Sequence, residues 1–390
     1  MTNRWAWILP VFFMVLAGAF VAFSGDLAAQ AVANNPYRAV YGWAGLPEGR
    51  ELGVVSGIKS DPDGEHLWIM DRCGGNQCAN SDLNPIHKFD LEGNVVKSLG
   101  AGLFAWPHGF DVDDEGNIWV TESAPVGDPR GEPGFSMGMG HQVFKLSPEG
   151  EVLMTLGEAG VAGDDKTHFN GPAAVVVAPN GEIWVADGHR SGNNRVIKFT
   201  PDGEFIFQLG GAGAGAGGGC AHAAPDGIAP SCPGPQPITD PIPGAGGVKT
   251  ASGDRSRFYD LHDLGMDSRG RLFVADRGNN RIQIFEQDGS FFEVWTQFGK
   301  PSGIAIDDDD RIYVADGMSD GRWAGRHWNP GWERGIRIGD ARTGWISAFI
   351  PDYEVSTSSS IEFLGVDSHG SIYAGDVGGR RLIKYVRVRP

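Results

Sequence analysis

The chain has 390 residues, a formal net charge of −17 at pH 7 and an isoelectric point near 4.9. This acidic balance argues against nucleic acid and anionic membrane surfaces as partners, because both repel a negatively charged protein. The length would allow two domains, but one internal repeat covers nearly all of the chain and therefore predicts a single domain.

The first 31 residues have the pattern of an export signal. An apolar run over residues 5–23 follows Arg4, and the small-x-small sequence Ala29-Gln30-Ala31 follows the run. This order predicts a signal peptide over residues 1–31 and a periplasmic or secreted protein. The apolar run is also long enough to act as an uncleaved anchor. In that alternative the protein faces outside the cytoplasm, and the anchor is its contact with the membrane.

Residues 37–390 are predicted to form one domain, in which a single pattern occurs six times. In each copy a short apolar strand leads through a glycine-containing turn to a second strand that ends in an acidic residue, as in Arg271–Asp276. Third and fourth strands with alternating polar and apolar residues follow, as in Arg281–Phe285. The six strand-end acids are Asp71, Glu122, Asp187, Asp276, Asp316 and Asp376. Repeats of about 40–50 residues rich in short strands predict an all-β, six-bladed β-propeller.

A glycine- and alanine-rich insertion over residues 210–253 interrupts the repeat between the third and fourth copies. This composition cannot form a packed core of its own. The four cysteines form two local pairs, one close to the first copy and one inside the insertion. An even number of cysteines in an exported chain favours disulfides, so we expect the bonds Cys73–Cys78 and Cys220–Cys232.

One position of the repeat carries side chains that can bind a metal, and we call it the slot. It lies five residues before the Asp that opens the turn, and copies two, four and six hold His108, His262 and Glu362 there. The other copies hold small residues at the slot, namely Ser56, Ala173 and Ser302. In a ring, alternate blades would place the three ligands around one axis, as a catalytic zinc site requires. A lone histidine in such a turn is also common as an ordinary loop residue.

Three more polar side chains follow the strand-end acids. Arg72 and Arg277 each follow an acid directly, and His189 stands two residues after another. These positions begin loops at the same rim of the propeller as the slot. A guanidinium group binds a carboxylate in a bidentate fork, and a histidine can act as a general base near neutral pH. The sequence thus predicts these three residues as catalytic, with salt bridges between blades and a surface histidine as alternatives.

The stretches Met70-Asp71-Arg72, Trp106-Pro107-His108-Gly109 and Val274–Gln283 carry a resemblance to known proteins. With them the chain resembles the NHL-repeat propellers, and more specifically the peptidyl-α-hydroxyglycine α-amidating lyase family, over most of its length. The resemblance implies Zn²⁺ held by histidines from alternate blades, with His108 and His262 as two of the ligands. It implies a peptide substrate ending in α-hydroxyglycine, whose charged end meets Arg72 and Arg277, and the products peptide amide and glyoxylate.

The chain departs from that family at three positions. Glu362 stands where the family has its third histidine, so the resemblance implies a zinc set of two histidines and one carboxylate. His189 stands where the family has a catalytic tyrosine, and a histidine base would move the pH profile of activity downward. Phe363 stands where the family has an aspartate of a structural Ca²⁺ site, so that possible second ion lacks this ligand.

The sequence therefore predicts an exported, monomeric, metal-dependent lyase that acts on a small molecule or peptide with a carboxylate. Two other classes of function fit the same fold. One is a non-catalytic NHL propeller that binds a protein or peptide partner across its rim. The other is a calcium-dependent, lactonase-like hydrolase, against which the two slot histidines argue because calcium prefers oxygen ligands.

Overall fold

The computed structural model describes residues 35–47, 49–124, 138–189, 192–210, 258–319, 329, 331–352 and 360–388. The predicted signal peptide, the predicted Cys220–Cys232 bond and nearly all of the insertion over 210–253 lie outside these residues. The described segments contain short 3-10 turns but no α-helix. Accordingly, nothing helical in this part of the chain is long and apolar enough to cross a membrane.

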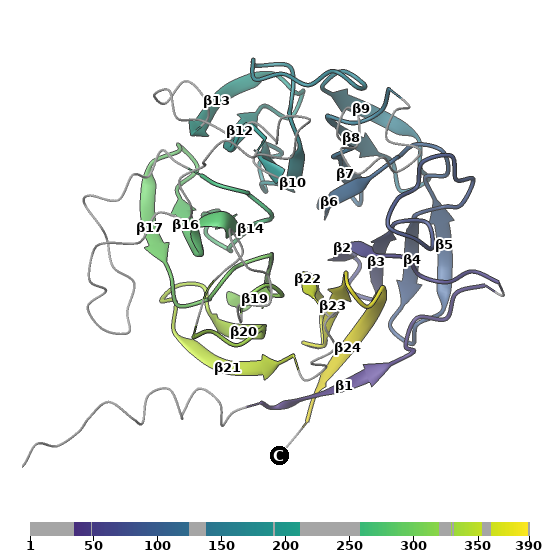
Figure 1. Ribbon diagram of the computed structural model, residues 1–390, viewed down its shortest axis with the longest axis vertical. Helices are drawn as coiled ribbons and strands as arrows, with labels where there is room; N and C mark the ends of the chain where they lie inside the picture. Colours follow the sequence, from purple (N-terminus) through teal and green to yellow (C-terminus); the bar gives the residue numbers. More distant parts are fainter. Residues whose placement is uncertain are drawn as a thin grey trace, which may run out of the picture.

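Six four-stranded antiparallel sheets form a ring, one sheet for each blade (Figure 1). Blade 1 contains β2 (Val55–Ser60), β3 (His66–Asp71), β4 (Ile86–Asp90) and β5 (Val95–Leu99). Blade 2 contains β6 (Pro107–Val112), β7 (Ile118–Glu122), β8 (Gln142–Leu146) and β9 (Val152–Leu156). Blade 3 contains β10 (Pro172–Val177), β11 (Ile183–Asp187), β12 (Arg195–Phe199) and β13 (Phe205–Gly210).

The second half of the ring repeats this order. Blade 4 contains β14 (Leu264–Met266), β15 (Leu272–Asp276), β16 (Arg281–Phe285) and β17 (Phe291–Trp295). Blade 5 contains β18 (Gly303–Ile306), β19 (Arg311–Asp316), β20 (Gly335–Asp340) and β21 (Ile346–Pro351). Blade 6 contains β22 (Ile361–Val366), β23 (Ile372–Asp376), β24 (Arg381–Arg387) and β1 (Tyr37–Tyr41). The predicted all-β, six-bladed propeller is confirmed.

The first strand of the chain completes the last blade. β1 runs antiparallel to β24, with Tyr37 opposite Arg387 and Tyr41 opposite Ile383. The purple start and the yellow end of the described chain therefore lie side by side (Figure 1). This pairing closes the ring through backbone hydrogen bonds between the two ends of the chain. The sequence did not predict it, because residues 37–41 precede the first copy of the repeat.

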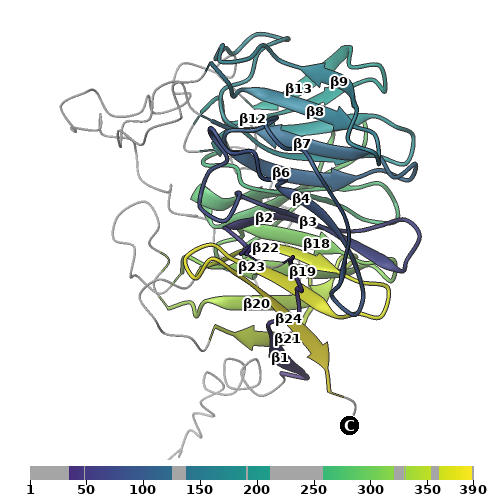
Figure 2. The ribbon, with the colours of Figure 1, turned by 90° about the vertical axis from the view of Figure 1, so that its right-hand side faces the viewer.

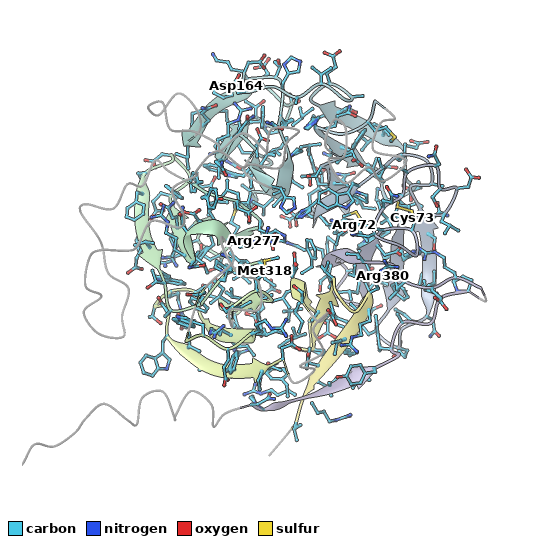
Figure 3. The ribbon with its side chains drawn as sticks, viewed as in Figure 1. Arg72, Cys73, Asp164, Arg277, Met318 and Arg380 are labelled. Carbon is cyan, nitrogen blue, oxygen red and sulfur yellow. A yellow bond between two sulfur atoms is a disulfide. The ribbon has the colours of Figure 1, made fainter. Side chains whose placement is uncertain are left out.

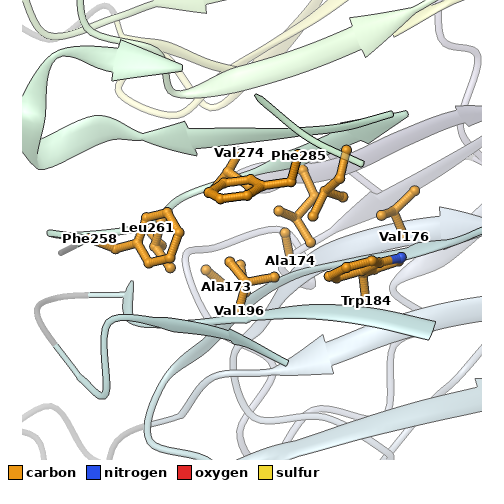
Figure 4. Packing of buried hydrophobic residues seen from close by; sticks show 12 residues of the cluster. Ala173, Ala174, Val176, Trp184, Val196, Phe258, Leu261, Val274 and Phe285 are labelled. Carbon is orange, nitrogen blue, oxygen red and sulfur yellow. The ribbon is translucent and has the colours of Figure 1, made fainter. Parts of the chain in front are cut away.

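The hydrophobic core lies between neighbouring blades. Every residue of β11 is buried, and Trp184 and Val176 of blade 3 pack toward Val274 and Phe285 of blade 4 (Figure 4). Seen from the side, the strands of successive blades lie in layers (Figure 2). Because a sheet in the ring is covered on both faces, its second strand is apolar on both sides, unlike the half-exposed strand of an open antiparallel sheet.

The first strand of each blade lies nearest the central channel. Around the ring these strands, β2, β6, β10, β14, β18 and β22, each contact the first strands of the neighbouring blades. All six run in the same direction relative to the channel, because every blade has the same strand order. Residues at their amino-terminal ends therefore meet at one rim, and this is where the slot lies.

Candidate metal centre

The acidic residue that ends each second strand fixes the loop leading into the first strand of its own blade. All six of these acids are fully buried. In blades 2, 4 and 6 they accept hydrogen bonds from the backbone N–H groups of Trp106 (2.9 Å), Tyr259 (2.8 Å) and Ser360 (2.8 Å). Each donor lies two or three residues before a slot residue. The strand-end acid of the repeat is thus the anchor that holds the slot in place.

Three imidazole rings meet at the rim of the channel. His108 lies on β6, His262 lies just before β14, and His189 follows β11. The ring centroids are 4.3 Å apart for His108 and His189, 4.8 Å for His108 and His262, and 5.2 Å for His189 and His262. All three rings are buried, and one ligand atom from each lies within 4.8 Å of the other two. Within the described part of the chain, these three histidines form the group of metal-capable side chains whose ligand atoms lie this close to one another.

Two of the imidazoles are oriented by the neighbouring blades. Nδ1 of His108 donates to the backbone oxygen of Ala173, and Nδ1 of His262 donates to that of Ser302, both at 2.8 Å. A carbonyl oxygen can only accept, so in each ring the proton lies on Nδ1 and Nε2 is left as the atom that could bind a metal. Ala173 and Ser302 are themselves the slot residues of blades 3 and 5. This second layer of hydrogen bonds is the one that metal-binding histidines generally have.

Two aromatic side chains pack against the imidazoles. The Trp106 ring lies 5.5 Å from His108 and 5.4 Å from His189, measured between centroids. The Phe363 ring lies 5.3 Å from His108 and 5.4 Å from His262. In this environment burial lowers the pKa of both His108 and His262, and nearby positive charges lower it further. The His108 and His262 imidazoles are therefore neutral at neutral pH, as metal binding requires.

Glu362 lies beside His262 and is held by an arginine. Its Oε2 atom is 3.2 Å from Nε2 of His262 and 3.3 Å from Nη1 of Arg277, and its Oε1 atom accepts a hydrogen bond from Ser360 at 2.9 Å. Arg277 also pairs with Asp260 at 3.1 Å. Burial alone would raise the pKa of Glu362, but the Arg277 guanidinium and the hydrogen bond from Ser360 favour the ionised carboxylate and act to lower the pKa. The carboxylate is thus ionised next to the imidazoles.

Arg72 reaches the same region from the other side of the channel, as the labelled side chains in Figure 3 show. Its guanidinium lies 4.2 Å over the Trp106 ring, and its Nε donates to the backbone oxygen of Pro107 at 3.0 Å. Nη1 donates to Asn76 at 2.8 Å, within the loop closed by the Cys73–Cys78 disulfide. This disulfide was predicted and is confirmed, and it constrains the loop that holds Arg72.

The two arginines are not paired with the acids that precede them in the sequence. Asp71 forms its ion pair with Arg50, and Asp276 pairs with Arg281 at 2.6 Å. Successive residues of an extended chain point to opposite faces. Because the acid points toward the slot loop, the arginine that follows it points away from that loop. All six residues that the sequence singled out, the three metal candidates and the three catalytic candidates, therefore lie in one region around the channel.

The donor set fits a transition metal. Imidazole nitrogen suits Zn²⁺, Cu²⁺, Fe²⁺ and Ni²⁺, whereas Ca²⁺ prefers carboxylate and carbonyl oxygens. Nε2 of His262 is buried and has no hydrogen-bond partner in the part of the chain described, although Glu362 Oε2 lies 3.2 Å from it. Tetrahedral zinc holds imidazole nitrogens about 3.3 Å apart, so binding would draw the ligand atoms together by up to about 1.5 Å. Phe363 brings an aromatic ring, not an oxygen ligand, to this region.

Asp260, Lys300 and Trp106 also belong to this region, but the sequence did not predict them as site residues. Lys300 is fully buried, and its Nζ donates to the backbone oxygen of Arg277 and to Asn280, both at 3.0 Å. A signal for these residues was present in the repeat. Trp106, Asp260 and Lys300 each stand two residues before a slot residue, as Ser360 does before Glu362. Aligning this second position across the copies would have found all four.

Comparison with known proteins agrees with the fold. The NHL repeat family matches residues 169–199 and 258–285. A solved streptogramin B lyase has the same overall fold, with a TM-score of 0.50, 14% identity, and coverage of 90% of this chain and 97% of that one. The chain is therefore a six-bladed β-propeller that carries NHL repeats.

Two curated relatives are more similar in sequence to this chain than the solved structure is. A Caenorhabditis elegans protein named "Probable peptidyl-alpha-hydroxyglycine alpha-amidating lyase pgal-1" is 33% identical over 60% of this chain and 56% of the relative. The Xenopus laevis peptidyl-glycine alpha-amidating monooxygenase B is 31% identical over 62% of this chain and 24% of the relative. The chain is similar to both, and the match spans about half of the first relative and about a quarter of the second.

Proposed function

We propose that this protein is a metal-dependent lyase that cleaves the C–N bond of an α-hydroxyglycine-type substrate and releases an amide and glyoxylate. The observation that carries the proposal is the cluster of three buried imidazoles with Arg277 and Arg72 on its two sides. The similarity to proteins named as amidating lyases supports the reaction class. Export, the metal and the substrate are parts of the proposal, and the N-terminal sequence pattern supports export.

His108 and His262 would hold the metal through Nε2, because their Nδ1 atoms are bound to the backbone of the next blade. A third ligand would come from His189 or Glu362, which both lie against these rings. A bound Zn²⁺ would supply Lewis acidity that makes the substrate hydroxyl easier to deprotonate. The aromatic rings of Trp106 and Phe363 would keep water away from this reaction.

The substrate carboxylate would meet the guanidinium groups. Arg72 is held in place before any substrate binds, by Pro107, by Asn76 and by stacking on Trp106. A guanidinium fixed in this way loses little conformational entropy when it binds a carboxylate in a bidentate fork. Arg277 contributes a second positive charge and sets the position of Glu362. The substrate's hydroxyl carbon would then lie between the arginines and the imidazoles.

The chemistry requires one proton to move. The hydroxyl O–H bond breaks and the C=O bond of glyoxylate forms as the electron pair of the C–N bond leaves with the amide nitrogen. The amide nitrogen then takes up a proton. Titratable side chains next to the reacting groups can carry this proton, and Glu362 and His189 are the ones adjacent to the imidazole pair.

The test is release of glyoxylate from an acyl-α-hydroxyglycine by the purified full chain. The chain would be assayed as isolated, after metal removal by a chelator, and after addition of Zn²⁺. We expect activity that disappears with the metal and returns with Zn²⁺, and that is absent in His108→Ala. The control is His168→Ala, which removes a half-buried histidine paired with Asp165, outside the imidazole cluster. A metal-loaded protein that releases no glyoxylate above the spontaneous rate contradicts the proposal.

A further inference from the structure

We propose that His189 is the third metal ligand, and that Glu362 is a positioning residue outside the coordination set. This assignment departs from the roles that the sequence suggested, in which Glu362 completed the ligand set and His189 acted as the base. It rests on the metal centre of the proposed function but not on the identity of the substrate.

The first argument is the geometry of the three rings. His189 is the nearest imidazole to His108, with 4.3 Å between centroids, closer than His262 at 4.8 Å. The mutual approach of ligand atoms to within 4.8 Å is met by His108, His189 and His262 together. If His108 and His262 are both ligands, a third histidine this close to both rings can bind the same ion.

The second argument is that the slot residue of blade 6 differs from those of blades 2 and 4 in its hydrogen bonds. In blades 2 and 4 the slot histidine donates Nδ1–H to the backbone of the next blade. A glutamate has no N–H to donate, and Glu362 turns instead to Ser360 and Arg277, which contact its two oxygens. Its negative charge is already balanced by Arg277. Glu362 therefore does not reproduce the arrangement that orients the two slot ligands.

The third argument is that His189 is held in place. The backbone N–H groups of Gly188 and His189 both donate to the oxygen of Gly171, at 3.0 and 2.9 Å. The Trp106 ring packs against the His189 ring. Blade 3 carries the small residue Ala173 at its slot, which leaves room for a side chain that enters from the following loop. A buried ligand on a fixed backbone is what a preorganised metal site requires.

The contact between Glu362 and His262 is consistent with a positioning role. The Nδ1 proton of His262 faces Ser302, so Nε2 meets the Glu362 carboxylate 3.2 Å away as one acceptor facing another. Two acceptors at this distance are stabilised by a cation next to both. A metal on the three imidazoles supplies that charge, and Glu362 then offsets the charge without needing to coordinate it.

The experiment is a titration of metal-free full chain with Co²⁺, whose visible absorption reports the ligand set. We expect one Co²⁺ per chain in the unmodified protein. We expect His189→Ala to weaken binding more than about 100-fold, which exceeds the about 10- to 100-fold loss typical of residues that only support a ligand. Glu362→Gln should keep one Co²⁺ with a loss within that smaller range. The control, His168→Ala, should bind as the unmodified protein does.

A second variant keeps the test decisive if His189→Ala does not fold. His189→Cys replaces one ligand by another, so it should bind one Co²⁺ and gain a sulfur-to-cobalt charge-transfer band in the near ultraviolet. Unchanged Co²⁺ affinity in His189→Ala, or no such band in cobalt-bound His189→Cys, overturns the assignment. Loss of binding in Glu362→Gln as large as in His108→Ala also overturns it.

These results are separable from those of the lyase assay. If His189 proves to be a ligand but no glyoxylate is released, the assignment stands and the proposed reaction fails. If glyoxylate is released and His189→Ala keeps full Co²⁺ affinity, the lyase stands and the assignment fails. If the unmodified chain binds no Co²⁺, the metal centre fails, and both proposals fail with it.

Discussion

Arg277 is the residue whose removal should cost the fold most among the candidate site residues. It is buried and contacts two buried carboxylates, Asp260 at 3.1 Å and Glu362 at 3.3 Å. Arg277→Met keeps a side chain of similar length and apolar packing but removes the positive charge. Asp260 and Glu362 then lose their guanidinium contact but remain in a poorly solvated region. Leaving a buried charge without its partner destabilises the folded state.

The size of the effect follows from this arrangement. Removing one partner of a buried ion pair typically destabilises a protein by about 3–5 kcal/mol. Unfolding entropy of about 2.1 cal/mol/K per residue over roughly 300 folded residues gives about 0.6 kcal/mol/K. The expected fall in Tm is therefore about 5–8 °C. The exposed pair of Arg342 and Asp340, at 2.9 Å, provides a matched control, and Arg342→Met should cost less than about 1 kcal/mol.

Thermal unfolding followed by circular dichroism would measure both variants. A chelator should be present, because a bound metal adds its own stabilisation to the folded state. The double variant Arg277→Met with Glu362→Gln should recover part of the loss, since one buried carboxylate is then neutral. A loss in Arg277→Met no larger than that in Arg342→Met would refute the view that Arg277 is held in a buried ion pair. It would leave Arg277 as a residue for substrate alone.

Two further predictions concern blade 2. A Cβ on Gly109 would lie 2.5 Å from the backbone at both Ala173 and Ala174, so Gly109→Ala should cost about 1–3 kcal/mol and weaken Co²⁺ binding through His108. Gly75→Ala, whose nearest neighbour would be 3.8 Å away, is the control for unfolding and Co²⁺ titration, and equal behaviour would contradict the clash. Burial raises the pKa of Glu122 to about 7, so the folded state keeps a proton that the unfolded state loses near pH 4.3. Stability should fall by up to about 4 kcal/mol as pH rises from about 4.3 to 7. Urea unfolding of Glu122→Gln should lack this fall, and parallel profiles for the two proteins would exclude it.

The repeat made the blades predictable because its information is local. Two strands, a glycine turn and a strand-end acid recur within each copy, and neighbouring strands of a blade are neighbours in sequence. The pairing of β1 with β24 was not predictable in this way. It joins Tyr37 to Arg387 across the whole chain, and residues 37–41 carry no copy of the repeat. Closure of the ring is a long-range contact that periodicity does not encode.

The site was predictable to the same extent. A shared register brought His108, His262 and Glu362 to one rim, because equivalent positions of equivalent strands must meet around the channel. The direction of a side chain within the rim depends on its neighbours. Glu362 turns toward Arg277, and His189 reaches the cluster from a loop that the register does not describe. The sequence could place these two residues near the channel but could not decide which of them would share a metal with His108 and His262.

The asymmetry of the centre arises from the position two residues before the slot. In blade 2 this position holds Trp106, which lies between Arg72 and the imidazoles of His108 and His189. In blades 4, 5 and 6 the position is polar, and its members tie Arg277 and Glu362 into one charged network; they are Asp260, Lys300 and Ser360. One side of the imidazole cluster is therefore aromatic and the other is ionic. Because this position lies just outside the first strand of each blade, exchanging a few side chains there would change the charge around a bound metal while leaving the propeller intact.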